Sequence, residues 1–129
     1  MPVIHFIRLR GPWQLAPASE PTQTRSATMP STWAQGGFVG FRGTMRHTRR
    51  FGAPTGIEPG DRLMLCATGL VGTGSATLNG AVLGDIGEGG FRFDITACVE
   101  PRNSLTIELT HDDDLGGLPG EVRLEVERD

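Results

Sequence analysis

The most concentrated chemistry in this 129-residue sequence is the acidic run Asp112, Asp113 and Asp114. Carboxylate oxygens are hard ligands that bind Ca²⁺ and accept hydrogen bonds from sugar hydroxyls. The run supplies three carboxylates, whereas Ca²⁺ takes about six to eight oxygen ligands. A solvated acidic turn is therefore favoured over a structural Ca²⁺ site, and we predict no bound cofactor and no metal ligands.

Sugar recognition usually combines such hydroxyl acceptors with an aromatic platform. Trp33 is the best candidate platform because it follows Pro30 and precedes Gly36 and Gly37, which is loop composition. Trp13 is the second candidate, and the chain has no tyrosine. The alternative for Trp33 is that it packs its loop onto the core, since a tryptophan buries a large area.

Arg46, Arg49 and Arg50 form the one basic cluster in the sequence. They could meet an anionic sugar, a phosphate or a protein partner. The alternative is a solvated charged strand edge, which discourages aggregation.

No catalytic constellation stands out. The sequence has fifteen acidic residues, so a pair at glycosidase spacing would arise easily by chance. There is no Gly-x-Ser-x-Gly elbow and no P-loop. His5, His47 and His111 are scattered, and we expect structural or surface roles for them. We therefore predict no catalytic residues.

Composition excludes several classes of protein. The net charge of −3 gives no general reason to bind nucleic acid, and no apolar run is long enough to span a membrane. Cys66 and Cys98 form no metal-binding pattern, and Cys66 lies in an apolar run, which favours a buried free thiol over a disulfide. The first residues lack signal-peptide features, so we expect a cytoplasmic protein unless a leader has been removed.

The elements that would position these residues read as strands. Asn79-Gly80 is typical of a type I′ hairpin turn. The apolar residues Phe91, Phe93 and Ile95 alternate with polar ones, as in a strand with one buried face. We also expect one kinked strand over residues 3–15, a short polar strand over 23–27, a turn of helix over 97–101, and further strands over 43–51, 63–67, 103–110 and 121–127. With nineteen glycines and nine prolines, the sequence indicates a single all-β domain over residues 1–129.

The same segments resemble a known family. The sugar-binding jelly-roll domain of family 2 glycoside hydrolases has similar motifs in the same order. In this sequence they are Met29-Pro30 with Trp33, Arg49-Arg50-Phe51 with Pro54, Leu78-Asn79-Gly80, Leu83-Gly84, Phe91 to Thr96, and Asn103 to Leu109. The resemblance implies an antiparallel jelly-roll β-sandwich like that of galactose-binding domains. In that family the catalytic glutamates belong to a separate barrel domain, so the resemblance also implies that this chain is not catalytic.

Three functions follow in order of preference. The first is a non-catalytic, carbohydrate-associated domain that binds sugar weakly or serves as an accessory to a glycosidase partner. The second is an interaction or assembly domain that keeps the sandwich without binding sugar, and the third is a small hydrolase using the acidic loop. For the first, we predict that Trp33 forms the floor of a shallow site at one end of the sandwich. Asp112, Asp113 and Asp114 would accept hydroxyls there, with an affinity on the order of 0.1–1 mM.

Overall fold

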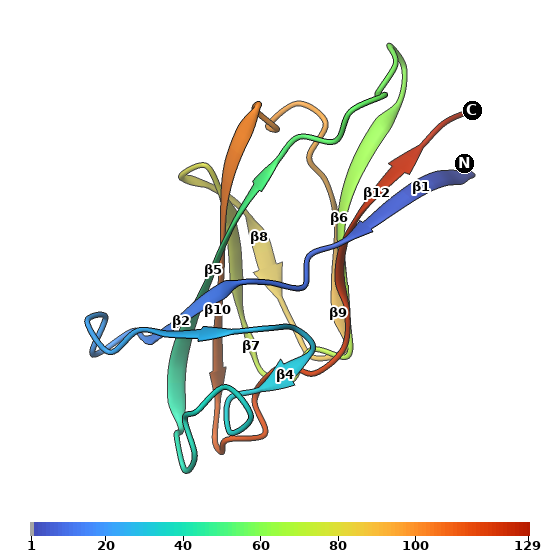
Figure 1. Ribbon diagram of the computed structural model, residues 1–129. Coiled ribbons are helices and arrows are strands. Elements are labelled where there is room, and N and C mark those ends of the chain that lie inside the picture. The colour runs from blue at the N-terminus through green and yellow to red at the C-terminus, as the bar shows by residue number, and fades with distance from the viewer. Residues whose placement is uncertain (1) are drawn as a thin grey trace.

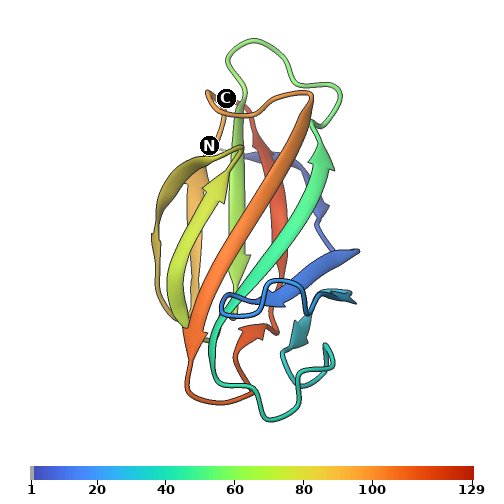
Figure 2. The same ribbon diagram turned by 90° about the vertical axis from the view of Figure 1, so that its left-hand side faces the viewer.

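Two antiparallel sheets face each other in the computed structural model, which describes residues 2–129 (Figure 1). The four-stranded sheet has the order β1 (Val3–Arg8), β12 (Val122–Glu127), β6 (Arg62–Thr68), β9 (Gly90–Asp94). The six-stranded sheet has the order β3 (Arg25–Ala27), β2 (Trp13–Pro17), β5 (Gly43–Gly52), β10 (Arg102–His111), β7 (Thr73–Leu78), β8 (Ala81–Ile86), and Figure 2 shows it face on. A short ladder joins β4 (Ser31–Thr32) to β11 (Gly117–Leu118). The all-β antiparallel sandwich predicted from the sequence is confirmed.

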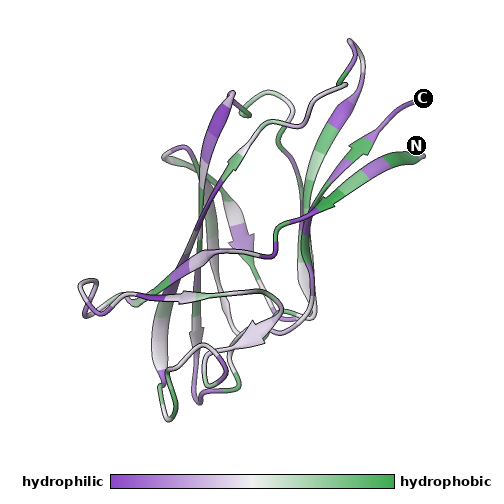
Figure 3. Cartoon of the chain, in the orientation of Figure 1, coloured by the Kyte–Doolittle hydropathy of each residue, from purple (hydrophilic) through white to green (hydrophobic). Residues whose placement is uncertain are grey.

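The core lies between the two sheets and follows the alternation seen in the sequence. Leu105, Ile107 and Leu109 of β10 are fully buried, and on β12 Leu124 and Val126 are buried from the opposite sheet. Each such aliphatic side chain contributes about 1.5–3 kcal/mol when it leaves water. Figure 3 shows the same alternation as changes between hydrophilic and hydrophobic colours along single strands. Among residues 2–129 the structure contains no helix that could cross a membrane.

The expected kinked strand over residues 3–15 is wrong. It is two strands in different sheets, because β1 pairs with β12 whereas β2 pairs with β3 and β5. Pro12 has no N–H to donate to a ladder, so pairing stops before it and the chain crosses between the sheets. The Nε1–H of Trp13 donates to the carbonyl of Leu9 at 2.7 Å and ties the two sides of this crossing together.

The turn of helix expected over residues 97–101 is a hydrogen-bonded turn only. The N–H groups of Cys98 and Val99 both donate to the carbonyl of Ile95, at 3.0 and 2.9 Å. Pro101 follows, and because it lacks an N–H it cannot continue a helix.

The hairpin around Asn79-Gly80 is confirmed. Asn79 has φ 53° and Gly80 φ 84°, which are the two positive values that a type I′ turn requires. The Asn79 side chain also accepts a hydrogen bond from the N–H of Ser104 at 2.9 Å and donates to Asn103 at 2.9 Å. The turn is thus fixed by its own backbone and by the start of β10.

This geometry predicts that Gly80→Val lowers the free energy of unfolding by about 1–3 kcal/mol, because a β-branched residue is strained at positive φ. Gly87→Val is the matched control. A Cβ at either position meets nothing within 4 Å, but only Gly80 has a left-handed φ. Urea unfolding of the two variants measures the difference. Equal midpoints for Gly80→Val and Gly87→Val would contradict the turn geometry.

Candidate ligand-binding groove

The structure brings together the two loops from which the sequence predicted a sugar site. The N–H of Trp33 donates to the carbonyl of Gly116 at 2.8 Å, and that of Ala34 to the carbonyl of Asp114 at 3.0 Å. The Asp114 carboxylate accepts the N–H of Gly40 at 2.8 Å. The predicted convergence of the two loops at one end of the sandwich is therefore correct.

The prediction that Trp33 forms an exposed platform is wrong. Its side chain is 0% exposed, and its Nε1–H donates to His47 Nε2 at 3.0 Å. Phe41 packs edge-on against the indole, with ring centroids 5.2 Å apart. Gly116 covers it so closely that a Cβ there would lie 2.7 Å from an indole carbon. With no face open to solvent, the indole cannot stack on a sugar, and the alternative interpretation of Trp33 as a core residue holds.

Two of the three aspartates, Asp113 and Asp114, stabilise the acidic loop through hydrogen bonds. Asp113 accepts the N–H of Leu115 at 3.0 Å and lies 3.4 Å from His111 Nε2, and Asp114 is held by Gly40. Asp112 is exposed. Among residues 2–129 no three His, Cys, Asp or Glu side chains gather in a way that could hold a metal ion.

His47 lies at the centre of the core, on β5. Its Nε2 accepts the indole N–H of Trp33, so its Nδ1 carries the proton and donates to the carbonyl of Ile107 at 2.8 Å. Burial in this apolar setting lowers the pKa of His47 to about 4, because desolvation disfavours the charged ring. The neutral ring therefore joins the Trp33 loop to the six-stranded sheet.

The basic cluster is not a single strip. Arg46 forms an ion pair with Glu108 on β10, with 2.9 Å between Nε and Oε2. Arg49 lies on the same strand parity as the buried Met45 and His47, while Arg50 is exposed on the other parity. Only Arg49 and Arg50 remain neighbours at the end of β5.

Both cysteines are free, Cys66 buried and Cys98 exposed, as predicted for Cys66. Burial raises the pKa of Cys66 to about 11, and the nearby Glu125 carboxylate adds to the effect. Its thiol is therefore protonated at neutral pH and unsuited to nucleophilic chemistry.

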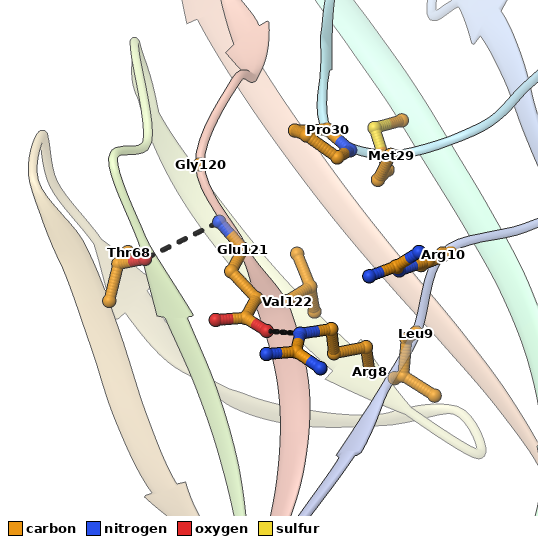
Figure 4. A pocket seen from close by; sticks show the side chains of 9 residues that line it. All are labelled: Arg8, Leu9, Arg10, Met29, Pro30, Thr68, Gly120, Glu121 and Val122. Atoms are coloured by element: carbon orange, nitrogen blue, oxygen red, sulfur yellow. Dashed lines mark hydrogen bonds and ion pairs between the residues drawn. The ribbon is translucent and has the colours of Figure 1, made fainter.

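The structure shows a groove that the sequence did not reveal, where the chain crosses from β1 to β2 beside the start of β12 (Figure 4). We call it the crossing groove. Its volume is about 380 Å³. The floor is apolar and buried, made by Leu9, Met29 and Val122. Gly120 forms part of the wall, and a Cβ there would lie 1.9 Å from the carbonyl oxygen of Thr68, so only glycine lets the segment before β12 approach the end of β6 this closely.

Polar groups line the rim of this groove. Arg8 forms an ion pair with Glu121, and the Thr68 hydroxyl accepts the N–H of Glu121 at 3.3 Å. Arg10 lines the groove from the crossing segment (Figure 4). Its side chain makes no hydrogen bond or ion pair with any residue from 2 to 129. A floor that can contact the apolar face of a small ring, with a free guanidinium above it, is typical of small-molecule sites. The groove was not predicted from the sequence, although the alternation of Arg8, Leu9 and Arg10 before Gly11-Pro12 is a signal that could have pointed to it.

No protein-family model and no curated protein matches the sequence. Among solved structures, an FMN-binding beta-glucuronidase from Faecalibacterium prausnitzii L2-6 has a TM-score of 0.81 at 27% identity, over 95% of this chain and 22% of its own. The beta-D-glucuronidase of Dictyoglomus thermophilum has a TM-score of 0.82 at 12% identity, over 97% of this chain and 28% of its own. A putative beta-galactosidase from Bacteroides fragilis has a TM-score of 0.76 at 18% identity, over 95% and 23%.

The chain thus spans less than a third of the length of each of these structures. Nearly all of it superposes on a limited part of these glycoside hydrolases, and that part shares its fold. The described residues form a β-sandwich with no alternation of strands and helices. The chain therefore has the fold of a sandwich domain found within these glycoside hydrolases, and it is not a catalytic barrel.

Proposed function

We propose that this chain is a non-catalytic, carbohydrate-associated domain that binds a sugar weakly in the crossing groove and serves as an accessory to a glycosidase activity. The observation that carries the proposal is the superposition of 95% of the chain on 22% of a beta-glucuronidase at 27% identity. The barrel that hydrolyses sugars would belong to a partner or to another part of the same enzyme.

The groove supplies the contacts for one sugar residue. Leu9 and Val122 offer an apolar floor, and Arg10 offers donors that no residue from 2 to 129 occupies. The Glu121 carboxylate and the Thr68 hydroxyl are acceptors on the opposite rim. The groove offers no aromatic platform among residues 2–129. Most of the binding free energy from these contacts is therefore offset by the cost of desolvating the polar groups and ordering the side chains. The expected dissociation constant is on the order of 0.1–1 mM.

The test is a titration of the purified chain with methyl β-glycosides of glucuronic acid, galactose and glucose, followed by amide NMR shifts. Shifts are expected at the groove residues, and Arg10→Gln should weaken binding by about tenfold, as for a lost charge-assisted hydrogen bond. Arg42→Gln, on an exposed loop, is the matched control and should bind as the parent does. Absence of any shift at sugar concentrations of about 10 mM, a free energy of only about 2.7 kcal/mol, would rule out useful sugar binding.

A specific observation favours an interaction domain as the second candidate. Both tryptophans are fully buried, while Val3, Ile4 and Phe6 are exposed on β1, an edge strand of the four-stranded sheet. Exposed apolar residues on an edge strand are typical of a contact surface. A sugar titration without shifts would make this candidate the preferred one.

A further inference from the structure

Three arginines gather at one end of the six-stranded sheet, and none of them lines the crossing groove. Arg49 and Arg50 lie at the end of β5, and Arg102 opens the neighbouring β10. The register places Arg102 opposite Gly52 and Ser104 opposite Arg50, so the two strands carry these side chains on adjacent positions. In Figure 2 this is the upper end of the sheet, where the arrowhead of β5 meets the beginning of β10.

These arginines differ from most others on the two sheets. Arg46 is paired with Glu108, Arg92 with Glu125, and Arg123 with Glu125 and Glu121. Arg50 and Arg102 make no side-chain hydrogen bond or ion pair with any residue between 2 and 129. Their charge is therefore not compensated by a bonded carboxylate.

The surface around them is hollowed, and none of the residues from 2 to 129 that line the hollows carries a carboxylate. A hollow of about 740 Å³ is lined by Arg50, Phe51, Gly52, Asn79, Pro101, Arg102, Asn103 and Ser104. A second hollow of about 400 Å³ lies beside it and is lined by Pro12, Gln14, Thr48, Arg49 and Arg50. The two hollows share Arg50 as a lining residue.

Arg49 adds a buried donor that has no acceptor. Its Nε is buried and makes no hydrogen bond within residues 2–129, although its terminal nitrogen donates to the carbonyl of Arg50. Desolvation lowers the pKa of Arg49, so a nearby anion would stabilise its charged form.

We propose that Arg50 and Arg102, with the Ser104 hydroxyl between them and Arg49 beside them, form a binding site for the carboxylate or sulfate groups of an acidic saccharide. Guanidinium groups bind such oxyanions through paired, charge-assisted hydrogen bonds. Two hollows that share Arg50 suit successive anionic groups along an oligosaccharide better than one compact anion. The assignment to a saccharide rests on the proposed function, whereas the oxyanion site rests on the arginines alone.

The experiment is calorimetry at low ionic strength with four probes: a sulfated tetrasaccharide derived from heparin, a tetragalacturonate, inorganic sulfate, and maltotetraose as the neutral control. Both acidic oligosaccharides are expected to bind more tightly than inorganic sulfate, and maltotetraose is expected not to bind at this site. Arg50→Gln and Arg102→Gln should each weaken acidic binding by about tenfold. Arg42→Gln removes the same charge from an exposed loop elsewhere and should change the affinity by less than twofold. Added salt should weaken binding, because exposed charges are screened.

Several results would overturn the proposal. These are no binding of either acidic oligosaccharide, equal losses in Arg42→Gln and Arg50→Gln, or tighter binding of single-stranded DNA than of the sulfated tetrasaccharide. Binding of inorganic sulfate without the oligosaccharides would also overturn it. Each of these outcomes leaves the titration of the crossing groove with the two neutral glycosides, those of galactose and glucose, unaffected, so the two proposals fail separately.

Discussion

Replacing Trp33 with alanine is expected to lower the free energy of unfolding by about 3–5 kcal/mol, the usual loss for a large buried aromatic side chain. The indole is fully buried and packs against Phe41, so its removal leaves a cavity between the two loops at the acidic end of the sandwich. It also leaves His47 Nε2 buried without a donor. Urea unfolding at pH 7 measures the loss.

Two further variants separate packing from hydrogen bonding. Trp33→Phe keeps an aromatic ring but not the N–H. It should therefore lower the free energy of unfolding, but by less than the alanine variant does. Leu115→Ala, on the acidic loop and 60% exposed, should change stability by less than about 0.5 kcal/mol. A Trp33→Ala loss no larger than that of Leu115→Ala would mean that the indole is not buried.

The second large effect is a loss of stability in mild acid caused by His47. Its pKa of about 4 in the folded chain lies below the ordinary value of about 6.5 that it regains on unfolding. Between these two values the unfolded chain binds a proton that the folded chain does not, so stability falls as pH falls. Above about pH 6.5 the burial of neutral His47 does not lower the free energy of unfolding. By about pH 4 the free energy of unfolding has fallen by about 3 kcal/mol because of this residue.

Urea unfolding at intervals from pH 7.5 to 4.5 measures this loss. Asp61, Asp94 and Glu125 also have lowered pKa values, but as carboxyl groups they begin to lose their contributions only near pH 4.5, at the lower limit of this window. The matched variant is His47→Gln, in which the amide can still accept from Trp33 and the decline attributed to His47 should disappear. An unchanged pH slope in His47→Gln would assign the loss to another group.

Much of the fold could be predicted because strand signals are local. The Asn79-Gly80 turn requires two positive φ values, and the sequence places there the two residues that tolerate them. The alternation in Val122, Leu124 and Val126 fixes which side of β12 enters the core. The split between β1 and β2 could not be predicted, because alternation says nothing about which sheet a strand joins.

The site was harder to predict because burial of a loop residue depends on distant segments. Trp33 sits among glycines and prolines typical of an exposed loop, yet Gly116 and His47, both remote in sequence, enclose it. The arginines show the same limit. Parity along β5 separates Arg49 from Arg46 and Arg50, but the pairing of Arg46 with Glu108 depends on the register between β5 and β10.

The pairing of β1 with β12 has a mechanical consequence. The two strands are antiparallel neighbours, with Val3 opposite Glu127, and both ends emerge at the same corner of the sandwich (Figure 1). Hydrogen bonds of an antiparallel ladder run perpendicular to the strands. A tension applied between the two ends therefore breaks these hydrogen bonds one pair at a time, starting at the Val3 end of β1. The ladder does not have to break all its hydrogen bonds at once. Under traction the sandwich opens first at this corner, and the opening reaches Leu9 last, because its N–H bonds the carbonyl of Val122 at the opposite end of the ladder.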